Sequence, residues 1–220
     1  MLKQRCEYKE QAKQLLQGKY TNVIVISLII GVITNLVNSP NYNLQAESTS
    51  FGVRLLSILA FALSAAFAFS QTKMYIGVVK DENPDVQDIV LVGFKENYVR
   101  SLVTLLLQSV YTFLWALLFI IPGIIKAYAY SMAFYLIYRE PELQAADAIT
   151  KSKEYTNGYK MDLFLLHLSY IGWYLLSILT LGILFLWVIP KVMTAQTLIF
   201  EEIYLKKNPV VEVKEPEVIE

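Results

Sequence analysis

Two residue types that build many active sites are almost missing from this chain. Among its 220 residues there is one histidine and one cysteine. A single histidine excludes a metal site with several histidine ligands, and a single cysteine excludes an internal disulfide and a cysteine metal set. The lone thiol, Cys6, could carry a lipid anchor near a membrane, although an unmodified thiol is the commoner state. Phosphate-binding loops and zinc-protease patterns are also missing.

Charged residues are scarce as well. They make up 17% of the chain, whereas a soluble domain usually has about 25%. Hydrophobic residues make up 55%, and the 19 basic and 19 acidic side chains cancel. No overall basic excess exists to hold nucleic acid. The composition predicts an integral membrane protein whose main partner is the lipid bilayer.

Long uncharged runs are what the sequence has in abundance. Residues 21–38 and 55–72 contain no charge, and each run suits one short span. Residues 101–137 and 163–200 contain one charge each. As one helix, the run 101–137 would be about 55 Å long, whereas the hydrocarbon core is about 30 Å thick. Each long run is therefore predicted to fold back on itself.

Turn signals give the places where the two long runs fold back. Pro122–Gly123 interrupts the first run, and either Leu181–Gly182 or Pro190 interrupts the second. The predicted fold is an all-α transmembrane bundle of six spans arranged as three helical hairpins. The spans are expected at about 21–38, 53–72, 100–120, 122–138, 162–180 and 182–203.

The basic residues favour this count, because cytoplasmic loops hold most of the Lys and Arg in membrane proteins. With six spans, sixteen of the 19 basic residues fall on one side. Five spans would divide the same clusters between two sides. The distribution predicts that both termini are cytoplasmic, including a disordered tail at 208–220 that mixes acids, valines and prolines.

The cytoplasmic segments share a layout. Asn83-Pro84-Asp85 and Glu140-Pro141-Glu142 each place a proline and an acid where a helix would begin. We predict three units that start near residues 3, 84 and 141, each an amphipathic cytoplasmic helix followed by a hairpin. The competing interpretation is that any membrane protein with short loops alternates in this way.

Small residues repeat at every fourth position in three of the spans. Such stripes suit close helix contact in lipid, although chance also produces them because alanine and serine are common in spans. The stripes are Ser27, Gly31 and Asn35; Ala60, Ser64 and Ala68; and Gly123, Ala127 and Ser131.

Two lysines within the spans are candidate functional residues, because charge inside a bilayer is costly. Lys191 is the stronger candidate. It follows Pro190, whose kink could free backbone carbonyls to receive the ammonium group. If Pro190 instead begins a helix, Lys191 lies at the outer interface and extends its head group into water. Lys126, near the outer mouth of span four, is expected to extend into water in the same way.

Uncharged polar side chains complete the candidate intramembrane site. His167, one turn into span five, could titrate near neutral pH or relay protons. A hydrogen bond to a neighbouring helix is the commoner role for a single histidine. Tyr128, Ser131 and Tyr135 share one face of span four, where they could line a polar path or form interhelical hydrogen bonds.

The stretch from Ile120 to Phe134, IIPGIIKAYAYSMAF, is distinctive together with AADAITKSK at 145–153 and LHLSYIGWYLLSILTLGILFLWVIP at 166–190. In these phrases the chain resembles the bacterial membrane proteins catalogued as domain of unknown function 975, over nearly its whole length. The resemblance implies a multi-pass protein of the bacterial plasma membrane and brings no activity, substrate or catalytic residue. A fainter likeness to the membrane domain of some glycerophosphodiester phosphodiesterases implies an association with lipid-related proteins.

Two functions remain open. One is a non-enzymatic scaffold or accessory protein that binds another membrane protein or a second copy of itself. The other is a transporter or channel for a small solute or lipid, which requires Lys191, His167 and the tyrosine face to point into one polar cavity. We expect no enzyme, cofactor or metal, since no nucleophile with a base and no pair of intramembrane acids can be assembled.

Overall fold

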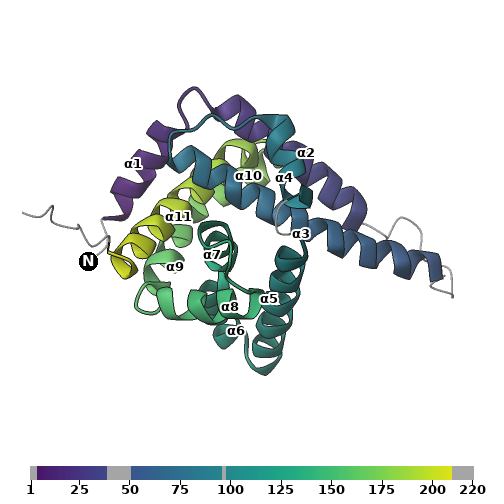
Figure 1. The fold of residues 1–220 in the computed structure, drawn as a ribbon. Helices are drawn as coiled ribbons and strands as arrows, with labels where there is room; N and C mark the ends of the chain where they lie inside the picture. Colours follow the sequence, from purple (N-terminus) through teal and green to yellow (C-terminus); the bar gives the residue numbers. More distant parts are fainter. Residues whose placement is uncertain (1–3, 39–50, 96–97, 210–220) are drawn as a thin grey trace, which may run out of the picture.

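A computed structural model of the protein describes residues 4–38, 51–95 and 98–209. All regular secondary structure in these ranges is α-helical, as predicted (Figure 1). The helices are α1 (Arg5–Leu15), α2 (Tyr20–Asn38), α3 (Phe51–Val79), α4 (Val86–Lys95), α5 (Tyr98–Leu118), α6 (Ile120–Tyr130), α7 (Ala133–Arg139), α8 (Ala145–Tyr155), α9 (Lys160–Leu168), α10 (Ile171–Leu179) and α11 (Phe185–Lys207).

The helices form three consecutive units. The short helices α1, α4 and α8 lie where the three amphipathic helices are predicted. Each is followed by a hairpin: α2 and α3, then α5 with α6–α7, then α9–α10 with α11. The turns that follow α1 and α8 have the same geometry, since Gly18 and Gly158 both have left-handed backbone, with φ of 78° and 88°. In both turns the residue after the glycine donates its N–H to the carbonyl three residues earlier, at 3.0 Å.

The three units pack in a closed cycle. Each short helix lies against the last helix of the preceding unit: α4 on α3, α8 on α7, and α1 on α11. The first hairpin helices follow the same rule, with α5 on α3, α9 on α6 and α2 on α11. The contact of α1 with α11 joins the two ends of the chain and closes the cycle.

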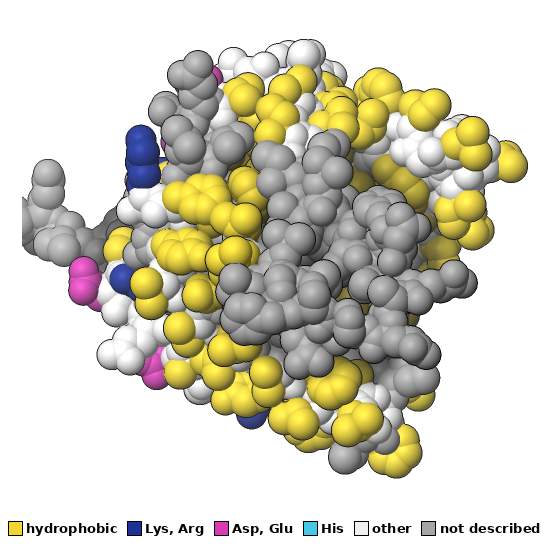
Figure 2. Space-filling model, turned by 90° about the vertical axis from the view of Figure 1, so that its right-hand side faces the viewer, with side chains coloured by type: hydrophobic (Ala, Val, Ile, Leu, Met, Phe, Trp, Pro, Cys, Tyr) yellow, Lys and Arg dark blue, Asp and Glu magenta, His cyan; other side chains and the backbone are white. Residues whose placement is uncertain are grey.

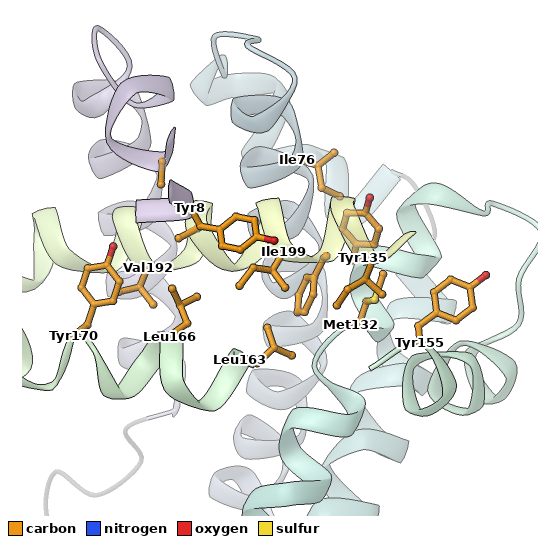
Figure 3. Close-up of a cluster of buried hydrophobic side chains, with 14 of the residues drawn as sticks. Tyr8, Ile76, Met132, Tyr135, Tyr155, Leu163, Leu166, Tyr170, Val192 and Ile199 are labelled. Carbon is orange, nitrogen blue, oxygen red and sulfur yellow. The ribbon is translucent and has the colours of Figure 1, made fainter. Parts of the chain in front are cut away.

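The second hairpin helices meet at an apolar centre. Ile76 of α3, Leu136 of α7 and Ile199 of α11 have no exposed surface, and they belong to one buried cluster. Figure 3 shows Tyr8 and Tyr135 extending into this cluster from α1 and α7. Burying such side chains stabilises a fold by roughly 1.5–3 kcal/mol each in water. In the described part of the chain this centre is filled by side chains of apolar character.

The turn between α5 and α6 differs from the prediction. The break between α5 and α6 falls at Phe119, which is extended with φ −159° and ψ 143°. Pro122 lies three residues later, in the first turn of α6, where its missing N–H costs no hydrogen bond. Gly123 lies against α5: a Cβ there would stand 2.8 Å from Ala116 Cα. The glycine therefore permits a close helix contact and does not form the turn.

The turn between α10 and α11 resolves an alternative that the sequence leaves open. Leu181 and Gly182 have positive φ angles of 53° and 87° and separate α10 from α11. Pro190 lies inside α11. Two further breaks were not predicted, at Ser131–Met132 between α6 and α7 and at Ser169–Tyr170 between α9 and α10.

Two helical segments of the described chain, Tyr98–Leu117 and Lys160–Leu179, are long and apolar enough to cross a membrane by length and composition. The six predicted spans are thus not all recovered. In α11 the charges of Lys191, Glu201 and Glu202 lower the hydropathy. The α2–α3 hairpin also points in a different direction from the α5–α6 hairpin, so the helices share no single axis (Figure 1).

Candidate functional site

A polar group forms around His167 where α6, α9 and α11 meet. Its Nδ1 lies 3.4 Å from the Tyr128 hydroxyl and 3.1 Å from the Leu163 carbonyl oxygen, one turn earlier in the same helix. The rings of His167 and Tyr128 are 5.6 Å apart, and the side chain of Gln196 also bonds to the imidazole. This geometry fits a histidine that joins neighbouring helices by hydrogen bonds.

The two candidate lysines lie elsewhere and separately. Lys191 Nζ lies 6.0 Å from the ring centroid of Tyr20, at the start of α2. Lys126 Nζ lies 4.3 Å from the ring centroid of Trp115, across the α5–α6 hairpin. Both are cation–π contacts, which stabilise a lysine by about 0.5–1 kcal/mol at exposed sites and more where water is excluded. The structure does not bring either lysine to His167.

The surroundings of Lys126 correct one prediction. The residue was expected near the outer mouth of span four, far from the cytoplasmic residues Lys153 and Lys160. Both of these lysines instead lie within electrostatic range of it. Ile121, near the start of α6, and Lys160, at the start of α9, line the same cavity. The two helices therefore begin side by side, whereas consecutive antiparallel spans would bring the start of one to the end of the other.

The predicted face of span four is divided among three environments, because α6 and α7 are separated by a break. Tyr128 faces His167. The Ser131 hydroxyl donates to the Tyr128 carbonyl at 2.8 Å. Tyr135 is buried, and its hydroxyl donates to the Glu201 carboxylate. In the described residues these side chains do not line one polar path.

Adjacent acids near the end of α11 form a network that sequence reasoning missed. Glu201 accepts hydrogen bonds from Tyr135 and from the Arg139 guanidinium, the latter at 2.6 Å. Glu202 accepts from the hydroxyl of Tyr8 at 2.5 Å. These bonds tie α1 and α7 to α11. Nothing local in the sequence identifies the pairs, since Tyr8 and Glu202 are 194 positions apart.

A second ion pair stabilises the segment before α8. Lys151 Nζ lies 2.6 Å from a carboxylate oxygen of Glu140. Partial burial alone would lower the pKa of Lys151, but the hydrogen bond and the negative charge of Glu140 outweigh burial and raise the pKa above its usual value. The pair fixes the loop between α7 and α8.

Hydroxyls at the C-terminal end of α8 and in the residue that follows it hold the break between α6 and α7. The Ser152 hydroxyl donates to the Ala129 carbonyl at 2.8 Å and accepts from the Met132 N–H at 3.2 Å. The Thr156 hydroxyl oxygen lies 3.2 Å from the same carbonyl and 2.8 Å from the Ser152 carbonyl, which is its nearer acceptor. Ser152 and Thr156 are fully buried. The Ser152 hydroxyl thus replaces hydrogen bonds that the interrupted helix has lost, and the Thr156 hydroxyl lies within reach of one of the same groups.

The small-residue stripes behave unequally. Gly123 makes the close contact described above, whereas a Cβ at Gly31 would meet nothing within 4 Å. Ser27 and Tyr75 hydroxyls are 3.5 Å apart. The tightest approach was not predicted: a Cβ at Gly93 would lie 2.0 Å from a backbone oxygen of α3. The structure therefore places Gly123 at a close helix contact, whereas an added Cβ at Gly31 would have room.

The other predicted packing positions make ordinary contacts. Ser64 bonds to a carbonyl in its own helix at 2.6 Å, and Ala68 and Ala127 are half-buried. Asn35 and Ala60 are residues whose side chains lie outside the described part of the chain, as does the predicted tail beyond residue 209. Across residues 4–38, 51–95 and 98–209, no three His, Cys, Asp or Glu side chains gather in a way that could hold a metal ion.

The fold and polar groups define an all-helical protein with two helices suited by length and composition to a membrane. Residues 1–127 and 117–207 match the family described as "Protein of unknown function (DUF975)". The chain belongs to this family, and the resemblance found in the sequence is confirmed. No curated protein and no solved structure matches significantly.

Proposed function

We propose that this protein is a non-enzymatic scaffold or accessory protein of the bacterial plasma membrane. The apolar hairpins would lie in the membrane, with both termini in the cytoplasm. The strict six-span alternation expected from the sequence is not part of the proposal, because α6 and α9 begin side by side. The observation that carries the proposal is the apolar centre where α3, α7 and α11 meet. Such a centre gives the fold rigidity and leaves no polar route through it among the described residues.

Exposed apolar side chains support the membrane location. Leu117, Phe119 and Ile121 at the end of the α5–α6 hairpin are 73%, 69% and 72% exposed. Hydrophobic side chains cover much of the face in Figure 2, whereas the charged groups there lie toward one side. A surface of this kind favours lipid contact, because a soluble monomer rarely exposes large continuous apolar patches.

The hairpin order and the charge distribution support a multi-pass arrangement. The short helices α1, α4 and α8 alternate with the apolar hairpins. Because the hairpins point in different directions, they would enter the bilayer tilted relative to one another. Tilt is common for membrane helices, at about 20° on average.

Topology and partner binding are tested separately. Reporter tags at residue 1, at residue 220 and in α8 at Lys153 should all be found in the cytoplasm, and a tag after Ala46 should be found outside. The purified protein should then contain more protein mass than one 25.2 kDa chain, because a partner or a second copy stays bound. Recovery of one chain with only detergent and lipid would contradict the scaffold.

A transporter is the second candidate, and the His167–Tyr128 contact is the observation that favours it. In that case His167→Gln and Lys191→Met should each abolish solute flux in reconstituted vesicles. Leu168→Gln, at the neighbouring position in α9, serves as a control for polarity alone. Flux that is unchanged in both variants would remove these residues from any transport mechanism.

A further inference from the structure

The turn between α10 and α11 exposes apolar side chains to an unusual degree. Leu179, Leu181 and Ile183 are 80%, 93% and 63% exposed. No charged residue occurs between Ile171 and Pro190. A turn in water usually carries several polar residues, because these hydrogen-bond to solvent, whereas here Gly182 is flanked by leucine and isoleucine.

The backbone of this turn is closed by its own hydrogen bonds. Four consecutive N–H groups, from Thr180 to Ile183, donate to carbonyl oxygens of the turn and of the end of α10 at 2.8–3.2 Å. The next N–H, that of Leu184, lies 3.4 Å from the Thr180 hydroxyl oxygen. This hydroxyl in turn donates to the Ser177 carbonyl at 3.1 Å. Helix ends in soluble proteins are commonly closed by a similar pattern, but a turn in hydrocarbon requires closure, because no solvent can satisfy a free N–H there.

Leucine is also a poor choice for the backbone conformation at position 181 in water. Leu181 has φ 53°, in the left-handed region where Gly and Asn are favoured. An asparagine would fit the conformation and could bond to water. A leucine that is 93% exposed gains nothing from the protein itself. It gains from its position only if the surroundings are apolar.

We propose that this turn is an immersed tip, which lies in the hydrocarbon of the outer leaflet and contacts lipid acyl chains. The proposal rests on the membrane location in the proposed function and adds the depth and the partner of one segment. Residues 160–179, which form α9 and α10 with the break at Ser169–Tyr170, would span at most about 30 Å at the rise of an α-helix, which matches the hydrocarbon core. The hairpin is therefore long enough to reach the outer edge of the core and too short to carry its turn into water.

Spin labelling measures the depth directly. In a Cys6→Ser background, Leu181→Cys is labelled with a nitroxide and reconstituted into phosphatidylcholine–phosphatidylglycerol vesicles. The label should collide readily with oxygen. It should collide at least about tenfold less with a water-soluble nickel chelate than a label at Lys207→Cys, an exposed position at the end of α11. Ile183→Cys provides a second site if the first variant does not fold.

Two results would overturn the immersed tip. Nickel accessibility equal to that at position 207 would place the turn in water. Low accessibility to both reagents would mean that a protein surface covers it, whether a partner or a second copy. Vesicle flotation comes first: a chain that stays with the soluble fraction contradicts the membrane location itself, which is a different failure from a floated protein with a wet turn.

A substitution with opposite expected signs gives an independent test. Leu181→Asn relieves the backbone and removes an exposed leucine, so it should raise the Tm if the turn lies in water. In hydrocarbon the same change places an amide among acyl chains and should lower the Tm in vesicles by several degrees. An unchanged or raised Tm would refute the immersed tip.

Discussion

Removal of the Ser152 hydroxyl should destabilise the fold far more than its size suggests. Ser152→Ala deletes one oxygen atom and leaves the packing of α8 in place. The deletion strands the Met132 N–H, which is bonded to Ser152 and has lost its helical partner at the break. It also takes the nearer donor from the Ala129 carbonyl, and the Thr156 hydroxyl, 3.2 Å away, can serve this carbonyl only by turning from the Ser152 carbonyl.

The magnitude follows from the burial of these groups. Ala129, Met132, Ser152 and Thr156 all have no exposed surface, so water cannot replace a lost bond without a rearrangement. A buried donor without a partner costs about 1–3 kcal/mol. For a soluble chain of this length, each kcal/mol shifts the Tm by about 2–4 °C. The shift for a membrane protein in detergent should have the same direction.

The assay is thermal unfolding in detergent, with Thr150→Ala as the matched control. Thr150 lies on the same helix, is exposed, and bonds to the Ala146 carbonyl of its own helix at 3.2 Å. Its loss should change stability by less than about 0.5 kcal/mol. The double variant Ser152→Ala/Thr156→Val should lose more than the sum of the single variants, because each hydroxyl can still serve the Ala129 carbonyl when the other is gone.

Either of two results would refute this account of the helix break. If Ser152→Ala unfolds at the same temperature as Thr150→Ala, the hydroxyl does not hold the break. If the double variant loses only the sum of the single losses, the two hydroxyls do not share one acceptor. The first result would mean that the break between α6 and α7 is stable by itself, and the second that each hydroxyl acts independently of the other.

Two glycine substitutions should have opposite effects, and one ion pair should depend on pH. Gly93→Ala should destabilise the fold by about 1–3 kcal/mol, because the new Cβ would lie 2.0 Å from the Ala66 carbonyl oxygen. Gly172→Ala meets nothing within 4 Å and should stabilise α10 by about 0.5 kcal/mol; equal Tm changes would contradict both. Since the pKa of Lys151 is raised above 10.5, its contact with Glu140 should stabilise the fold fully below pH 10.5 and be lost at higher pH. Lys151→Met should abolish this alkaline loss, as a Tm series from about pH 7 to about pH 11 would show.

Features that depend on neighbouring residues could be predicted from the sequence. The helical class and the short helices follow from uncharged runs separated by charged segments. Leu181–Gly182 is a turn in the structure because glycine adopts the left-handed conformation at little cost. The break near Pro122 lies three residues before the proline, at Phe119. A proline is tolerated in the first turn of a helix, so it marks the start of the helix after a break and not the break itself.

Features that depend on distant residues could not be predicted. Nothing between Tyr130 and Ala133 breaks a helix by itself, and the partner that permits the break is Ser152 on another helix. The pairing of Tyr135 with Glu201 likewise requires the fold to be known. The candidate site was predicted as one intramembrane group. Its members have in common that they are polar residues in apolar runs, but the structure places them in separate surroundings.

The cyclic packing explains why the two ends of the chain carry specific polar contacts. In two of three units the short helix follows the hairpin it packs against, so chain connection alone keeps α4 near α3 and α8 near α7. No such connection holds α1 against α11, the contact that closes the cycle. The Tyr8–Glu202 hydrogen bond and the burial of Ala12 occur at this junction. Specific contacts between the N-terminal and C-terminal helices thus replace the covalent link that the other two junctions have.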